Sequence, residues 1–187
     1  RAALVAMTEA RIFDLYDDPM GDVAMFEGYA GETASALIQL AALILDLDSA
    51  RSLSEASGHA GIAQLTAGCL MQLPLHVRRQ QIFVPQSILT ATGLTPQAFL
   101  KGEDRERIAA ALSAFAGLGR DHLARARQAA KGKFTGGTHL AYLGAALAEG
   151  VFDDAAKRGS DLMQRSVQPS QLRRQWRLWR ASRRKMF

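Results

Sequence analysis

The sequence lacks the features that mark several classes of protein. It has one cysteine, Cys69, so no internal disulfide can form and a disulfide-stapled secreted scaffold is excluded. Its longest strongly apolar stretch, residues 34–45, is interrupted by Ser35 and Gln39 and is shorter than the ~20 residues of a membrane-spanning helix. We therefore expect a cytoplasmic protein without a transmembrane segment, and its 187 residues suit a single domain.

Sustained alternation of apolar and polar residues, the pattern of strands, is also missing. Apolar residues instead recur at intervals of three and four, and glycine and proline divide the chain into helical segments. The helices that we expect span residues 1–16, 22–45, 52–73, 95–102, 103–130, 138–150, 152–165 and 170–187. Residues 78–92, with the run Ile82-Phe83-Val84 before Pro85, suit an extended segment that leads into a single turn of helix. Pro74 is expected to end the third helix, and Thr95 and Gly102 are expected to begin and close the fourth. The prediction is an all-α protein in which residues 1–187 form one domain.

Acidic residues are absent from residues 171–187, which hold seven of the 23 lysines and arginines. The rest of the chain has 16 basic and 18 acidic residues, so the net charge of +5 belongs to this tail. Residues 170–187 form a predicted basic amphipathic terminal helix with Leu172, Trp176, Trp179 and Met186 roughly on one side.

Tryptophan at an interface and arginine toward head groups are typical of a helix on an anionic membrane or on a protein partner. The residues of that candidate surface are Arg173, Trp176, Arg177, Trp179 and Arg180. Docking of the tryptophans into the core of the protein is the alternative. Nucleic acid is not an expected partner, because no other basic face follows a phosphate backbone.

The helix expected over residues 52–73 is unusually rich in small residues, with three glycines in its interior. A glycine inside a helix costs about 1 kcal/mol relative to alanine, so three of them indicate a reason. Either the backbone closely approaches another helix, or space is left between helices for a long apolar ligand.

Three segments resemble the squalene/phytoene synthase family over about residues 4–130. GIAQLTAGCLMQLPLHVRRQQIFVP, residues 61–85, is similar to the second signature of that family, and YAGETASALI, residues 29–38, is similar to the helix before it. GLTPQAFL resembles the segment that follows the signature. The resemblance implies an all-α, isoprenoid (terpene) synthase-like helical bundle whose N-terminal helices are absent from this chain.

Members of this family join two prenyl diphosphates head to head, with Mg²⁺ held by two acidic clusters. Here the acidic positions of the second cluster fall on Gln72, Leu75 and His76, and none is a carboxylate. Magnesium prefers oxygen ligands, so this half of the metal site is expected to be lost. We predict no cofactor and no metal ligands in this chain, with Mg²⁺ bound only if the upstream Asp-rich motif suffices. LPLHVRRQQIFVP and QWRLWRASRR are similar to the complex I assembly factor-like branch of the family, which has no demonstrated synthase activity.

The arginine pair Arg78 and Arg79, with His76, gives candidates for binding a diphosphate or another anion. The alternatives are solvated arginines or pairs with Glu103 and Asp104, and a loop hydrogen bond for His76. Candidate residues lining a cavity are Tyr29, Thr33, Gly58, Gly61, Gln64 and Gly68.

The cluster Asp14-x-x-Asp17-Asp18 superficially copies a magnesium-binding motif. Pro19 follows it directly, so these acids are expected at a helix end, and Asp22 is expected to cap the next helix. The single cysteine lies among apolar residues and is expected to be a buried small side chain.

Together, these patterns predict a synthase-like protein degenerate in Mg²⁺-dependent prenyl transfer, which binds an isoprenoid diphosphate or lipid or acts in membrane-complex assembly. One alternative is an active head-to-head prenyl diphosphate synthase, so whether the chain is an enzyme is left open. Another is a structural adaptor that docks a partner through the basic terminal helix. A peripheral position on the inner face of a membrane suits the first prediction.

Overall fold

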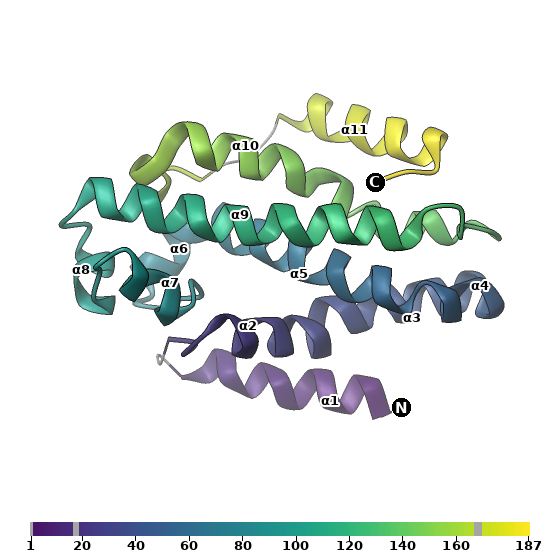
Figure 1. Cartoon of the computed structure of the whole chain (residues 1–187), viewed down its shortest axis with the longest axis horizontal. Helices are drawn as coiled ribbons and strands as arrows, with labels where there is room; N and C mark the ends of the chain where they lie inside the picture. The colour runs from purple at the N-terminus through teal and green to yellow at the C-terminus, as the bar shows by residue number, and fades with distance from the viewer. Residues whose placement is uncertain (1, 17–18, 167–169) are drawn as a thin grey trace.

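The computed structural model describes residues 2–16, 19–166 and 170–187 (Figure 1). Every regular element in these ranges is helical, which confirms the all-α prediction. The α-helices are α1 (Ala2–Ala10), α2 (Val23–Ala30), α3 (Ala36–Leu45), α4 (Leu47–Ser52), α5 (Ser54–Met71), α6 (Leu73–Arg78), α7 (Gln86–Ala91), α8 (Pro96–Lys101), α9 (Arg105–Ala130), α10 (Ala148–Arg158) and α11 (Gln171–Arg184).

Helices α5 and α9 pack against each other in the centre of the bundle. Helix α10 lies against α9 on one side, and α2 and α3 lie on the other, with α1 outside them (Figure 1). Phe26 of α2 meets Phe115 of α9 edge to face, with ring centroids 5.1 Å apart. The two rings are fully buried, so this contact joins α2 to the central pair within one apolar core.

A π-helical segment, Gly31–Ser35, joins α2 to α3 and touches α5. The Ser35 hydroxyl donates a hydrogen bond to the Gly58 carbonyl oxygen at 2.8 Å. A Cβ atom added to Gly61 would collide with the backbone of Ser35, so the helices approach this closely only because position 61 has no side chain. At Gly61, close packing therefore explains the glycine.

A chain of polar side chains also crosses the bundle. Glu27 of α2 contacts the Nε2 atom of His122 of α9 at 3.1 Å, and the Nδ1 atom of His122 lies 3.0 Å from that of His59 of α5. Burial lowers the pKa of His122, the nearby Glu27 carboxylate opposes this shift, and His59 and Arg125 add to it. A neutral His122 can donate to Glu27 and accept from His59, so the buried ring is satisfied on both sides.

Several predicted helix boundaries are wrong. The helix expected over residues 1–16 is α1, which ends at Ala10, followed by the 3-10 turn Arg11–Leu15. Pro74 was expected to end a helix, but it lies in the first turn of α6, where proline costs no hydrogen bond. Gly150 was expected to separate two helices, but α10 continues through it. The Arg177 side chain passes over Gly150 where a Cβ atom would stand, so packing explains this glycine as well. Residues 138–147 form 3-10 turns before α10.

Other local predictions are confirmed. The Asp22 side chain accepts a hydrogen bond from the backbone N–H of Met25 at 2.8 Å and caps α2. Thr95 caps α8 in the same way, and Gly102 ends that helix in the left-handed conformation. Cys69 is buried, and burial raises the pKa of its thiol to about 12.

The continuous helix Val23–Leu45 is long and apolar enough to cross a membrane by length and composition. The sequence prediction included this helix, over residues 22–45, but judged membrane-spanning length only on its most apolar stretch, residues 34–45. Core helices of soluble proteins pass the same criterion, and here Phe26, Tyr29 and Ile38 are buried in the bundle.

The glycines of α5 provide a stability test. Gly61→Ala should lower the free energy of unfolding by about 1–3 kcal/mol, because the new methyl group meets backbone that cannot move aside. Gly58→Ala, with open space around its Cβ position, should raise it by up to about 1 kcal/mol. Urea denaturation followed by circular dichroism measures both, and a Gly61→Ala protein as stable as Gly58→Ala would contradict the close approach.

Candidate functional site

One face of α5 borders three adjoining hollows. Gln64, Gly68 and Gln72 are spaced four residues apart and therefore lie on the same side of the helix. Each of the three lines two of the hollows, whose volumes are about 310, 360 and 430 Å³. We call this surface the α5 groove. No atom lies within 4 Å of the position that a Cβ atom of Gly68 would take, so the middle of the groove is open.

The smallest hollow, of about 310 Å³, is the polar end of the groove and is called here the polar cleft. It forms where the 3-10 turn Arg11–Leu15, helix α2, helix α5 and the segment after α6 meet. Its lining residues are Arg11, Asp14, Tyr29, Leu65, Gly68, Cys69, Gln72, His76, Arg79, Gln81 and Phe83.

Asp14 organises one wall of the polar cleft. Its carboxylate accepts hydrogen bonds from the Tyr29 hydroxyl at 2.8 Å and from the Arg11 guanidinium at 3.1 Å. The Gln81 side-chain amide donates to the Asp14 backbone carbonyl oxygen at 3.3 Å. Burial raises the pKa of Tyr29, and its hydrogen bond to Asp14 raises it further, so the phenol stays protonated.

Sequence reasoning placed the Asp14 cluster at a helix end, outside the site, and it missed Arg11, Asp14 and Gln81. Asp14 does lie near the end of a helical turn, but that turn folds back over α2 and faces the cleft. The other two acids of the motif, Asp17 and Asp18, lie outside the described residues. Asp14 and Tyr29 are fifteen residues apart, so no local spacing identified the pair.

The opposite wall holds His76 and Arg79. The chain turns sharply after α6: Gln80 adopts a left-handed backbone with φ of 59°, and the Gln81 N–H bonds to the His76 carbonyl oxygen at 2.9 Å. The His76 ring packs against Phe83, with centroids 4.6 Å apart. Burial lowers the pKa of His76 and the neighbouring Arg79 lowers it further, against a weaker opposite effect of Asp14. His76 is therefore a neutral hydrogen-bonding group at pH 7.

The two arginines of the pair differ in position. Arg79 lines the polar cleft, whereas Arg78 is exposed at the last position of α6 and is not part of the cleft wall. An extended backbone was expected here, but Arg78 is helical and Arg79 caps the helix. The expected alternative partners, Glu103 and Asp104, pair instead with Lys101 and Arg107.

The six predicted cavity residues divide into two groups. Tyr29, Gln64 and Gly68 line the groove. The other three do not line it. Ser35 fills the space at Gly61, and Thr33 is buried and donates to the Tyr29 carbonyl oxygen at 2.6 Å. Gly58 has open space around its Cβ position, away from the groove, and its backbone carbonyl accepts from Ser35. A small residue in a helix does not reveal whether the space beside it is open or part of a cavity.

The residues of the polar cleft do not fit a magnesium site. Of the three positions at which the family has acids, Gln72 and His76 line the cleft, and Leu75 is 41% exposed. Both carboxylate oxygens of Asp14 are engaged. Within residues 2–16, 19–166 and 170–187, no three His, Cys, Asp or Glu side chains are grouped to hold a metal ion.

The predicted surface of α11 is largely exposed. Trp176 and Trp179 are 54% and 57% exposed, so the alternative that they dock into the core is wrong. Arg173 and Arg180 are exposed too, whereas Arg177 is half-buried against α10.

A solved structure with this architecture is the squalene synthase HpnC from Alicyclobacillus acidocaldarius. The two align with a TM-score of 0.72 at 14% sequence identity, covering 84% of this chain and 60% of HpnC. The fold is therefore that of an isoprenoid synthase-like helical bundle, as predicted.

Comparison of sequences adds more specific relatives. The NADH dehydrogenase (ubiquinone) complex I assembly factors 6 of Homo sapiens and Rattus norvegicus are each 27% identical to this chain over 124 residues, which is 66% of the chain. The match spans 37% of the length of these curated relatives. The sequence profile of the squalene/phytoene synthase family matches residues 1–180, and the chain therefore belongs to that family.

Proposed function

We propose that this chain binds an anionic isoprenoid or lipid in the α5 groove and is degenerate in Mg²⁺-dependent prenyl transfer. The observation that carries the proposal is the polar cleft, which is lined by Arg11, Arg79 and His76 but has neutral residues, Gln72 and His76, where the family has carboxylates for magnesium. A cleft with two guanidinium groups and one carboxylate favours an anion over a metal ion.

Arg79 is the proposed anchor of the ligand's anionic group. It is exposed to solvent at the cleft wall, and its planar guanidinium can donate two parallel hydrogen bonds to phosphate oxygens. Arg11 is partly committed to Asp14 but lines two of the hollows. Neutral His76 adds a hydrogen bond without adding charge.

Part of the rest of the groove suits an apolar chain. Beyond Gly68 its apolar wall residues include Ala34, Leu37, Leu65, Ala67 and Val151, and the largest hollow is also lined by Gln171 and Arg174 of α11. Each hollow has the volume of a small-molecule site, and the hollows adjoin along α5. An amphiphile with its anionic group in the polar cleft would lay its hydrocarbon along this helix.

Ligand binding is tested with farnesyl diphosphate as the probe, in buffer with EDTA to exclude metal. The unmodified protein should bind in isothermal titration calorimetry, and Arg79→Gln should weaken binding by roughly 10- to 100-fold, because a charge-assisted hydrogen bond is lost. Arg78→Gln removes the same charge one residue away, outside the cleft, and should bind normally. Equal loss in both variants, or no binding by the unmodified protein, would refute the assignment.

A second pair of variants tests the open middle of the groove. Gly68→Leu should fill the hollow and abolish binding of the probe while the protein stays folded. Gly58→Leu places the same side chain on the same helix, also in open space but away from the groove, and should leave binding intact.

Loss of catalysis is tested by product formation. With farnesyl or geranylgeranyl diphosphate, Mg²⁺ and NADPH, the unmodified protein should release no diphosphate and yield no coupled product. The variant Gln72→Asp/Leu75→Glu/His76→Asp restores the family's acids and is assayed in parallel. Product from the unmodified protein would establish the alternative, an active head-to-head prenyl diphosphate synthase.

The relationship to complex I assembly factor 6 favours a second proposal, a role in the assembly of a membrane complex. Deleting the gene in the organism that encodes this chain should lower NADH:ubiquinone oxidoreductase activity and deplete the complex on native gels. Re-expression of the unmodified protein should restore both. Unchanged amounts of the complex after deletion would contradict this role.

A further inference from the structure

Helix α11 lies on the outside of the bundle, next to α10 (Figure 1). Its inner side is fixed by Ala181, which is buried, and by Arg177, which crosses Gly150. The helix therefore presents one defined side to the body of the protein and the opposite side to solvent.

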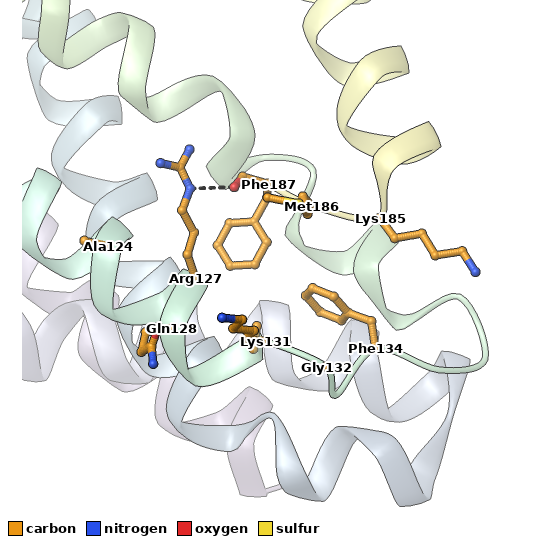
Figure 2. A pocket seen from close by; sticks show the side chains of 10 residues that line it. Ala124, Arg127, Gln128, Lys131, Gly132, Phe134, Lys185, Met186 and Phe187 are labelled. Carbon is orange, nitrogen blue, oxygen red and sulfur yellow. Dashed lines mark hydrogen bonds between the residues drawn. The ribbon is translucent and has the colours of Figure 1, made fainter.

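The end of α11 is anchored separately. Lys185 takes a left-handed backbone that turns the chain back, and Phe187 is buried near Phe134, with which it lines an apolar pocket (Figure 2). The Phe187 ring stacks on Tyr142 with centroids 5.0 Å apart, and the Arg127 Nε–H donates to the Phe187 carbonyl oxygen at 2.6 Å. With both its inner side and its end fixed, α11 cannot rotate its outer side inward without breaking these contacts.

The outer side carries an apolar stripe. Leu172, Trp176 and Trp179 are spaced by four and three residues and share one face, and they are 79%, 54% and 57% exposed, with Trp176 at the edge of the hollow between α11 and α10. Met186, just beyond the helix, is 65% exposed. The two solvent-exposed indole rings leave a large apolar area unburied. Exposed apolar patches of this kind are typical of interaction surfaces.

Arginines flank this stripe. The Arg180 guanidinium lies over the Trp176 ring at 5.2 Å, and that of Arg183 lies over Trp179 at 5.3 Å. In the described part of the chain, the salt bridges of the neighbouring Glu149 and Asp153 are made by Arg127 and Arg120, and none involves an arginine of α11. The stripe is thus apolar at its centre and cationic at its edges.

We propose that α11 is a membrane-docking helix that lies flat on a bilayer containing anionic lipid. Leu172, Trp176 and Trp179 enter the interface, and Arg173, Arg180 and Arg183 contact lipid phosphates. A helix with tryptophan and arginine side by side matches the boundary between acyl chains and head groups. The remainder of the chain has more acidic than basic residues, so charge attracts only this face to the membrane. Docking places the protein peripherally on the membrane, independently of any ligand in the α5 groove.

The test uses intrinsic fluorescence, because Trp176 and Trp179 are the two tryptophans of the sequence. On vesicles of phosphatidylcholine with phosphatidylglycerol, the emission should shift to shorter wavelength and be quenched by lipids brominated on their acyl chains. Vesicles of phosphatidylcholine alone should bind much more weakly, and salt should weaken binding to the anionic vesicles.

Arg173→Gln/Arg180→Gln/Arg183→Gln keeps both reporters and should weaken binding to anionic vesicles by roughly a hundredfold. The matched control, Arg51→Gln/Lys157→Gln/Arg158→Gln, removes three exposed charges elsewhere and should bind like the unmodified protein. Gly68→Leu should also bind vesicles normally, which separates this proposal from ligand binding.

Three results would overturn membrane docking. They are unchanged emission on anionic vesicles, equal loss of binding in the two triple variants, or binding to an oligonucleotide or a protein without binding to vesicles.

Discussion

The close approach of α5 to the π-helical segment Gly31–Ser35 is the constraint on which the groove depends. Gly61 allows contact with Ser35, and the Ser35 hydroxyl bonds to the Gly58 carbonyl on the same helix. This contact fixes the rotation of α5 about its axis. Gly68 follows Gly61 by seven residues and Gln72 follows it by eleven, so they lie on the same side of α5 as Gly61, and the contact at Gly61 turns this side toward the hollows. The π segment begins two residues after Tyr29, so the same contact helps to position one wall of the polar cleft.

The sequence allowed the helical class, the family resemblance and several helix caps to be predicted, because these depend on residues near one another in the chain. The three-and-four spacing, Asp22 and Thr95 are signals of that kind. The function of each α5 glycine was not predictable. Gly61 and Gly68 are equally small, and only the position of Ser35 shows that one is covered and the other open.

The polar cleft also shows that local sequence signals do not predict contacts between residues that are distant in the chain. Arg79 and His76 were found because they fall within a recognisable signature, whereas Asp14 was set aside because it lies outside it. Its hydrogen bond to Tyr29 depends on how the turn after α1 folds back, which is a tertiary property. The helix expected over residues 1–16 is divided into α1, which ends at Ala10, and the 3-10 turn Arg11–Leu15, and Pro19 does not predict this division. Local sequence signals therefore predicted the wall with His76 and Arg79 but not the wall with Asp14.

The charge of the polar cleft connects the altered signature with the proposed ligand. A site that binds several Mg²⁺ ions needs a surplus of carboxylates, and the metals then neutralise the diphosphate. Here Gln72 and His76 carry no negative charge at neutral pH, and Asp14 is engaged by Arg11 and Tyr29. Guanidinium groups can neutralise a bound anion directly, but they do not activate a leaving group as three metal ions do. The proposed function combines these two consequences: without the acids, prenyl transfer is lost, and the guanidinium groups hold the anionic end of an amphiphile.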